Sequence, residues 1–271
     1  MINMNLIKFI NPISDLAILA GEAILEVYNS DFEIEEKSDL SPLTEADLRS
    51  HKVIVRGLES IDRKIPIISE EDNLQNFDKR KQWKRYWLID PLDGTKEFIN
   101  KNGEFTVNIA LIENNKPVLG VVHVPVSAET YIACQGFGAK KIDSQGTIKT
   151  ISVRKKTNNP INVIGSRSHR GDSLAKFLDN LGDYQFYSVG SSLKFCMIAE
   201  GKADIYPRFG PTSEWDTAAA QVITEQAGGM VIDIKGNQLL YNTKKDILNP
   251  YFYAIGSNDL LHLAKNYKIT Q

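Results

Sequence analysis

Two carboxylates three residues apart, Asp90 and Asp93, follow an apolar segment in the sequence YWLIDPLDGTKEF at residues 86–98. The aromatic and branched residues 86–89 predict a buried strand, which we expect to end at Asp90. The DGT sequence at residues 93–95 has turn and N-cap chemistry, so a helix is expected directly after it. Carboxylates bind hard divalent cations, and N–H groups at a helix start bind anions. This corner therefore favours a metal-bound phosphate, although a turn capped by acids would explain the same residues.

Further acids could join such a site. Residues 70–72 are three consecutive acids, which repel one another unless they are solvated or bound to a cation. Asp47 stands at capping-box spacing from Thr44, so it is either a helix cap or an acid held near a metal. Asp216 is expected in the first turn of a small-residue helix at residues 215–226. That placement suits the helix dipole, but the small alanines would equally allow the acid to approach a neighbouring site.

The elements that would position these acids follow from the periodicity of apolar residues. Core-facing helices are expected at residues 13–29 and from just past Pro42 to about Ile61. The first half continues with strands, and the second half alternates strands and helices. The expected strands of the first half are residues 65–68, 86–89, 105–112, 117–126 and 130–134. Those of the second half are residues 161–165, 184–189, 203–206, 230–234 and 251–255, with helices at 173–180, 191–200 and 215–226.

The polar segment TISVRKKTNNP at residues 150–160 marks the expected domain boundary. We therefore predict an α+β domain at residues 1–155, which carries most of the candidate metal ligands. An α/β domain at residues 156–271 would carry Asp216.

Composition narrows the class of protein. The chain has 271 residues, of which 42% are hydrophobic and 24% charged, as expected for a soluble globular protein. Its formal net charge of −2 argues against a nucleic-acid partner. Cys134 and Cys196 are too few for a disulfide framework, which fits a reducing cytoplasm. Asp15 and Glu22 interrupt the apolar N-terminal stretch, so we expect a packed helix there and no integral membrane segment.

Three motifs carry a resemblance to a known family. SEE at 69–71, DPLDGT at 90–95 and WDTAA at 215–219 resemble the signature of the inositol monophosphatase superfamily of lithium-sensitive, magnesium-dependent phosphomonoesterases. The resemblance spans roughly residues 36–255 and implies the layered αβαβα sandwich of the inositol monophosphatase and fructose-1,6-bisphosphatase type, an α+β/α/β fold. It implies two or three Mg²⁺ ions per site, held by Glu70, Asp90, the backbone carbonyl of Leu92, Asp93 and Asp216.

The resemblance also implies catalytic and substrate-binding roles. Thr95 would position the attacking water and would itself be oriented by Glu70 or by Asp47. The N–H groups of Gly94 and Thr95 would hold phosphate oxygens. Substrate contacts are expected from Leu92, Asp93, Gly94, Thr95 and Asp216.

Other segments resemble one branch, the CysQ-type 3′(2′),5′-bisphosphate nucleotidases. These are KSDLSPLTEAD at 37–47, DGTKEF at 93–98 and GPTSEWDTAA at 210–219. The branch implies hydrolysis of adenosine 3′,5′-bisphosphate to AMP and phosphate, which clears a by-product of sulfate activation. The residues implied to hold the 5′-phosphate and sugar are His169, Ser191, Lys194 and Arg208. A second dianion remote from the metal needs basic partners, although each basic residue alone could be a solvated surface charge.

Two other functions remain open at this stage. An inositol or sugar monophosphatase could use the same scaffold, but it would have no second phosphate for Lys194 and Arg208 to bind. A catalytically silent binding protein would be expected to have lost a metal ligand, and every ligand position is intact. We expect a monomer or homodimer in the cytoplasm; attachment to the inner face of the membrane stays open, although no lipid motif supports it.

Overall fold

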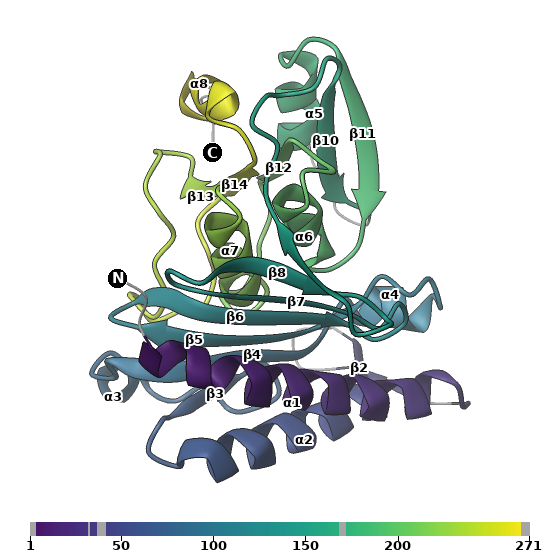
Figure 1. Cartoon of the computed structure of the whole chain (residues 1–271), viewed down its shortest axis with the longest axis vertical. Helices are drawn as coiled ribbons and strands as arrows, with labels where there is room; N and C mark the ends of the chain where they lie inside the picture. The colour runs from purple at the N-terminus through teal and green to yellow at the C-terminus, as the bar shows by residue number, and fades with distance from the viewer. Residues whose placement is uncertain (1–3, 32, 37–41, 168–171, 267–271) are drawn as a thin grey trace.

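The protein is described by a computed structural model that covers residues 4–31, 33–36, 42–167 and 172–266 (Figure 1). Its larger sheet has seven strands in the order β3-β4-β5-β6-β7-β8-β9, all antiparallel neighbours except the parallel pair β3 and β4. These strands are β3 (Ile67–Ser69), β4 (Arg85–Asp93), β5 (Thr106–Glu113), β6 (Lys116–Val124), β7 (Glu129–Cys134), β8 (Gly138–Ile142) and β9 (Ile148–Ile151).

A second, mixed sheet has five strands in the order β11-β10-β12-β14-β13. Its strands are β10 (Ile161–Ser166), β11 (Tyr184–Val189), β12 (Ile205–Arg208), β13 (Met230–Asp233) and β14 (Phe252–Ile255). A separate short hairpin pairs β1 (Ile34–Glu36) with β2 (Pro42–Thr44). The division of the chain into two domains at residue 155 stays a prediction.

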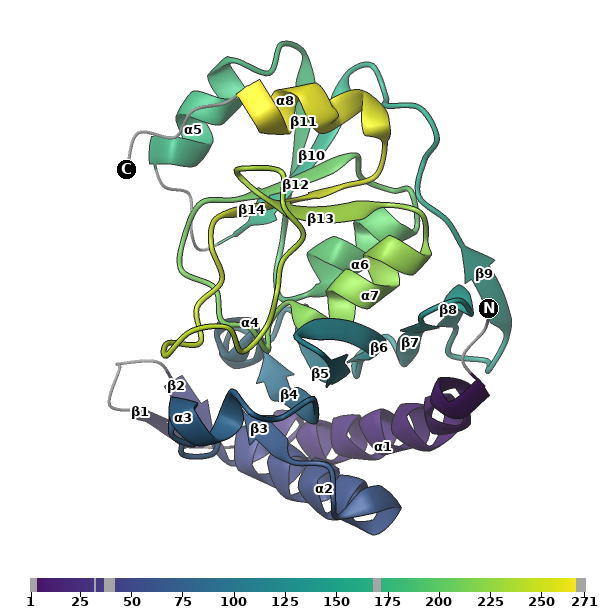
Figure 2. The ribbon, with the colours of Figure 1, turned by 90° about the vertical axis from the view of Figure 1, so that its left-hand side faces the viewer.

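Helices fill the space between the sheets and cover their outer faces, so the molecule has the five layers αβαβα (Figure 2). The fold class implied by the sequence motifs is thereby confirmed. The outer helices of the larger sheet are α1 (Met4–Tyr28) and α2 (Glu45–Asp62), and between the sheets lie α6 (Leu193–Ala199) and α7 (Ala218–Gln226). The smaller sheet is covered by α5 (Asp172–Asp179), η1 (Asn258–Leu260) and α8 (Leu261–Asn266); α3 (Phe77–Arg80) and α4 (Thr95–Ile99) lie at the ends of strands.

The central strands are buried on both faces, which explains their long apolar runs. In β5, Val107, Ile109 and Leu111 pack into the cluster under α1 and α2, whereas Ala110 and Ile112 pack into the cluster around α7. None of the described helices combines the length and the apolar character that crossing a bilayer requires.

Strand β4 does not end at Asp90, as we expected, but continues to Asp93. The register with β5 shifts between Asp90 and Asp93, so Pro91 lies where the ladder is already interrupted and its missing N–H costs no regular bond. The Ser50 hydroxyl of α2 donates to the Pro91 carbonyl at 2.7 Å. Gly94 then takes a left-handed conformation with φ 99° and precedes α4. The irregular segment therefore holds both carboxylates at the sheet end, beside a helix start.

Other boundaries differ from the prediction. Helix α1 starts at Met4 rather than residue 13 and contains Pro12, because Leu6, Phe9 and Ile10 also bury side chains against the sheet. Helix α7 starts at Ala218, so Asp216 lies in a turn before the helix and not in its first turn. Strands β8 and β9 were not predicted, because their mixed polar sequences show no clear alternation.

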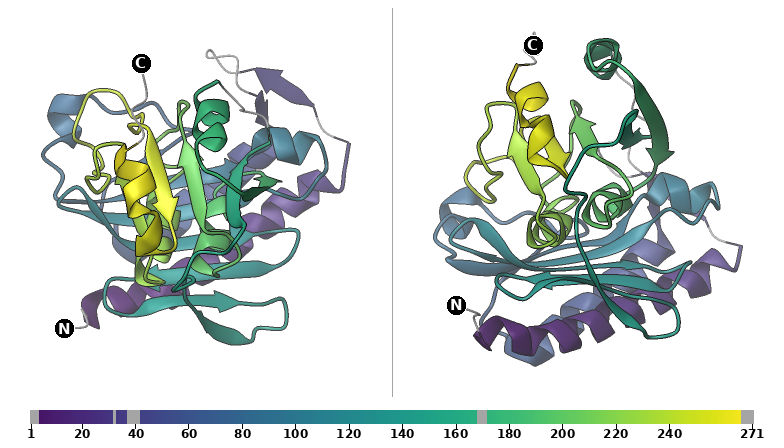
Figure 3. Two further views of the ribbon diagram at one scale, coloured as in Figure 1. Left: turned by 90° about the horizontal axis from the view of Figure 1, so that it is seen from above. Right: turned by 45° about the horizontal axis from the view of Figure 1, so that its top comes forward.

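Helix α7 packs closely on the larger sheet at Gly120 of β6. A Cβ atom at Gly120 would lie 2.2 Å from the carbonyl oxygen of Ala219, so only glycine fits there. Figure 3 shows α6 and α7 side by side between the two sheets. The small residues of α7 thus bring the Asp216 turn close to the ends of the strands.

We expect Gly120→Ala to lower the free energy of unfolding by about 1–3 kcal/mol, because the added methyl group must displace backbone atoms of α7. Gly256→Ala is a matched control, since its Cβ would meet its nearest neighbour, the Asp204 carbonyl oxygen, at an ordinary 3.5 Å. Urea denaturation of both variants measures the difference. Equal stability of the two would contradict the close contact.

Candidate active site

A cavity of about 310 Å³ opens where the ends of the larger sheet meet the second half of the chain. Both halves line it, and the lining includes all the predicted site residues except Asp47 and His169. Those lining residues are Glu70, Asp90, Leu92, Asp93, Gly94, Thr95, Ser191, Lys194, Arg208 and Asp216. Asp47 lies directly behind Thr95, while His169 falls outside the described residues.

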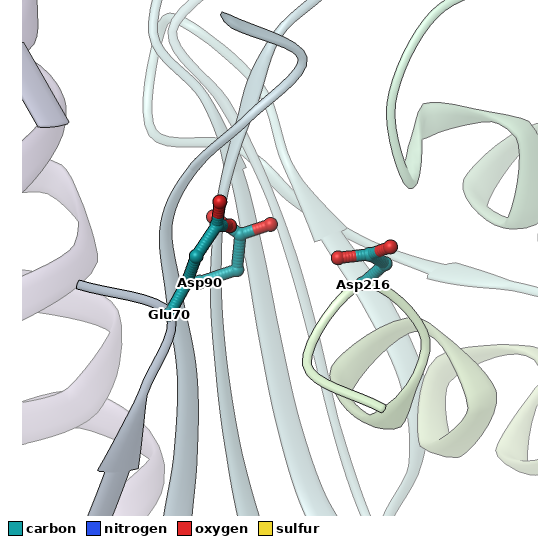
Figure 4. A group of neighbouring side chains, drawn as sticks. All are labelled: Glu70, Asp90 and Asp216. Atoms are coloured by element: carbon teal, nitrogen blue, oxygen red, sulfur yellow. The ribbon is translucent and has the colours of Figure 1, made fainter. Parts of the chain in front are cut away.

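Three carboxylates converge at one end of this cavity. Glu70, Asp90 and Asp216 each contribute an oxygen atom, and these three atoms lie within 4.8 Å of one another. Figure 4 shows Glu70 and Asp90 side by side at neighbouring strand ends, with Asp216 facing them from the turn before α7. The Glu70 N–H donates to the Ile89 carbonyl at 3.3 Å, which continues the parallel pairing of β3 and β4 into this segment.

Two of these acids, Asp90 and Asp216, have environments that oppose their ionisation. Burial raises the pKa of Asp90 well above its ordinary value, and the nearby Glu70 and Asp93 raise it further. Desolvation, Asp93 and Glu70 raise the pKa of Asp216 in the same way, against a 2.9 Å bond from the Ser213 N–H. A bound cation would favour the ionised form of both carboxyls. A set of carboxylate oxygens fits a hard divalent cation such as Mg²⁺.

Asp93 lines the same cavity but is oriented toward the second half of the chain. Its Oδ2 atom accepts a bond from the Ser192 N–H at 2.5 Å and another from the Asn108 amide at 3.3 Å. Desolvation raises the pKa of Asp93 to about 6, against the opposing attraction of Lys194. Leu92 also lines the cavity, and its N–H donates to Asp90 Oδ1 at 3.0 Å.

Both carboxylate oxygens of Asp47 have partners on the protein. Its Oδ2 atom accepts bonds from the N–H and the hydroxyl of Thr44, at 2.8 and 2.7 Å, at the start of α2. Its Oδ1 atom lies 3.4 Å from the Thr95 hydroxyl oxygen. Asp47 is therefore a helix cap whose second oxygen also faces Thr95, the first residue of α4.

The lining of the cavity also includes the cationic side chains of Lys194 and Arg208. Lys194 is only 6% exposed, and its ammonium group donates to the Ser191 carbonyl at 2.5 Å and lies 5.3 Å from the ring centroid of Tyr206. Burial lowers the pKa of Lys194 to about 8, while Asp93 opposes that shift. Arg208 is held by the Thr212 hydroxyl at 2.6 Å and by the Pro211 carbonyl at 2.7 Å. We call Glu70, Asp90 and Asp216 the acidic end of this cavity and Lys194 and Arg208 its basic end; Asp93 and Asp216 are close enough to act on Lys194.

Sequence reasoning missed two polar residues that hold this arrangement together, Asn108 and Ser192. Asn108 is fully buried and is the one polar residue between the two ends of β5, TVNIALIE. That exception was the available signal, because a buried amide needs hydrogen-bond partners. Ser192 is adjacent to the predicted Ser191, but its role depends on contacts with the distant strand β5.

Comparisons with known proteins agree with this geometry. The family model described as the inositol monophosphatase family matches residues 6–264. The chain is 50% identical over 245 residues to the 3′(2′),5′-bisphosphate nucleotidase CysQ of Salmonella typhimurium, covering 90% of this chain and 98% of that protein. It is 44% identical over 251 residues to the protein of that name from Buchnera aphidicola, covering 91% and 93%.

A solved structure is also similar along nearly the whole chain. The crystal structure of CysQ from Bacteroides thetaiotaomicron superposes with a TM-score of 0.79 at 39% identity, covering 91% of this chain and 97% of that one. Inositol monophosphatase from Anabaena shares the fold, with a TM-score of 0.77 at 24% identity and coverage of 97% and 96%.

Proposed function

Because the chain belongs to the inositol monophosphatase family, we propose that it is a Mg²⁺-dependent phosphomonoesterase that hydrolyses adenosine 3′,5′-bisphosphate to AMP and phosphate. The observation that carries this proposal is that one cavity is lined both by the converging acids Glu70, Asp90 and Asp216 and by the cations Lys194 and Arg208. The identity to the CysQ relatives supports the nucleotide over an inositol phosphate. In a cell, this reaction would clear a by-product of sulfate activation.

The acidic end would hold the metal ions. Glu70, Asp90, Asp93, Asp216 and the Leu92 carbonyl are the proposed ligands for two or three Mg²⁺ ions. Bound there, the ions would supply a more acidic water and stabilise the leaving oxygen.

The chain's own residues would orient the water and the scissile phosphate. We propose that the Thr95 hydroxyl positions the attacking water, with its orientation supported by the Asp47 carboxylate 3.4 Å away and by Glu70. The N–H groups of Gly94 and Thr95 lie at the start of α4 and would donate to the phosphate oxygens.

The basic end would bind the 5′-phosphate. Lys194 is held among carbonyl oxygens inside the molecule, so its side chain needs little reordering when an anion arrives. Arg208 presents its guanidinium to the cavity from β12, and Ser191 contributes from a turn with φ 49°. His169 remains part of the proposed set, although it lies outside the described residues. A dianion at this end would be separated from the scissile phosphate by the sugar.

The remaining proposals concern assembly and location. We propose that the protein acts as a monomer or homodimer in the cytoplasm, where the free, buried Cys134 and Cys196 would stay reduced. Attachment to the inner face of the membrane stays open.

The decisive assay measures phosphate release from adenosine 3′,5′-bisphosphate and from inositol 1-phosphate in parallel, with Mg²⁺ and after adding a chelator or lithium. We expect preference for the bisphosphate and loss of activity on chelation. Preference for inositol 1-phosphate would keep the metal site and refute the nucleotide assignment. Inactivity on both substrates would favour a binding protein instead.

Stabilisation by Mg²⁺ should depend on pH. A carboxyl whose pKa is raised in the folded state binds more protons folded than unfolded, so metal-free stability falls as the pH rises to about 6, the pKa of Asp93. Asp90 and Asp216 shift in the same direction, whereas Lys194, with a pKa of about 8, stays mostly protonated below pH 7. We expect Mg²⁺ to raise the melting temperature about 4 °C more at pH 7 than at pH 5. An equal increase at both pH values would argue against cation binding by these acids.

A further inference from the structure

The turn at residues 190–192 comes from the second half of the chain but is held by side chains of the first half. The Gly190 N–H donates to Glu104 Oε2 at 2.8 Å, and the Ser192 N–H donates to Asp93 Oδ2 at 2.5 Å. A Cβ atom at Gly190 would lie 2.5 Å from the side chain of Glu97, so the turn packs directly on α4. The turn that carries Ser191 is thus fixed to the segments that carry the acids.

Asn108 joins the two ends of the cavity at the centre of this contact. Its amide nitrogen donates to Asp93 Oδ2 at 3.3 Å, and its amide oxygen accepts a bond from the Ser192 hydroxyl at 2.8 Å. The Thr106 hydroxyl completes the group, 2.9 Å from Ser192 Oγ and 3.2 Å from Asn108 Oδ1. The amide has one useful orientation, because a rotated amide would place its oxygen against the Asp93 carboxylate.

Because Asn108 is fully buried, water cannot replace either of its bonds. Asp93 is thus joined to the 190–192 turn both directly, by the Ser192 N–H, and through Asn108. A cation that fixes Asp93 would also fix the turn, and an anion bound at Ser191 and Lys194 would fix Asp93.

We propose that Asn108 is a positioning residue that couples Mg²⁺ binding at Asp93 to binding of the distal 5′-phosphate at the 190–192 turn. The inference rests on the proposed function, since it needs a substrate with a second phosphate. Coupling between two binding sites is reciprocal, so each ligand raises the affinity for the other by the same factor. A substrate without the distal phosphate gains nothing from it, which adds to the discrimination between bisphosphates and monophosphates.

Calorimetry with Mg²⁺ and 3′-deoxyadenosine 5′-monophosphate tests this coupling without turnover. This nucleotide carries the distal phosphate but has no 3′-hydroxyl, so the comparison of the wild type with Asn108→Ala measures the part of the coupling that passes through Asn108. In the wild-type protein, we expect a saturating concentration of the nucleotide to lower the Kd for Mg²⁺ by about fivefold or more. We call the Kd for Mg²⁺ without nucleotide divided by the Kd with nucleotide the coupling ratio. In Asn108→Ala, this ratio should fall below about twofold.

Asn249→Ala is the matched control. Asn249 is 9% exposed, and its amide donates to the Ser213 carbonyl and the Thr217 hydroxyl, which flank the Asp216 turn. This variant should bind Mg²⁺ more weakly but keep the wild-type ratio, because it has no bond to the 190–192 turn. A change in stability alone would likewise leave the ratio unchanged.

The outcomes separate the two proposals. A wild-type ratio near one, or an unchanged ratio in Asn108→Ala, would refute the coupling and leave the nucleotidase assignment standing. If the wild-type protein does not bind the nucleotide, the assignment of the basic end fails and the coupling fails with it. Should Asn108→Ala not fold, Ser192→Ala decides the question, since it breaks the same bridge at the turn and should also reduce the ratio below about twofold.

Discussion

Replacing Asp90 with asparagine should lower kcat about 1,000-fold and leave the metal-free protein at least as stable as the wild type. The loss of activity follows because a metal contributes several kcal/mol to phosphoryl transfer, and each 1.4 kcal/mol is about tenfold in rate. Stability should not fall, because the neutral amide removes a carboxylate that burial and the neighbouring Glu70 already disfavour. Asparagine also keeps an oxygen that can accept the Leu92 N–H.

Single-turnover kinetics and thermal unfolding in EDTA measure the two effects of Asp90→Asn. Asp78→Asn is the control, since Asp78 is an exposed acid of α3 that pairs with Lys81 on the surface and should change neither property. If Asp90→Asn keeps near-normal activity, Asp90 is not a metal ligand and only accepts hydrogen bonds within the bulged segment. A metal-free variant that is clearly less stable than the wild type would mean that the acids do not repel one another.

Lys194→Met should lower kcat/KM for adenosine 3′,5′-bisphosphate about 100-fold, while adenosine 3′-monophosphate loses less than about fivefold. The two substrates share the base, the sugar and the scissile phosphate, so only the 5′-phosphate distinguishes them. A buried, charge-assisted hydrogen bond to a phosphate contributes about 2–3 kcal/mol, which corresponds to that factor. Methionine retains an unbranched apolar side chain against Tyr206, so the packing of α6 should survive.

Lys202→Met provides the comparison, because Lys202 pairs with Glu200 at the surface, far less buried than Lys194. That variant should lose little on either substrate. If Lys194→Met lowers kcat/KM equally for both substrates, Lys194 supports Asp93 or the 190–192 turn and does not bind the second phosphate.

The acids of the site could be predicted from the sequence because each stands at the end of an apolar element. Asp90 and Asp93 lie in the last part of the core strand β4, and Glu70 follows β3. Sequence alone could not fix their mutual distances, which depend on parallel pairing of β3 with β4 and on the position of α7.

The other features that the sequence did not predict all depend on tertiary contacts. The bulge that carries β4 past Pro91 depends on its pairing with β5 and on a bond from Ser50, 41 residues earlier in the chain. The turn that holds Asp216 outside α7 depends on its bond from Ser213 and on the support of Asn249. Asn108 stood out as an amide in an apolar strand, but its partners came from residues 93 and 192, which no local pattern connects.

The close packing at Gly120 also bears on which ions the acids can accept. Because Gly120 has no side chain, α7 packs directly against β6 at Ala219, three residues after Asp216. Ca²⁺ binds oxygen at 2.3–2.6 Å with six to eight ligands, whereas Mg²⁺ needs about 2.0–2.1 Å and six. We therefore expect the packing at Gly120 to influence the spacing between Asp216 and the strand-end acids, and through that spacing the choice between these ions, without any contact with the metal.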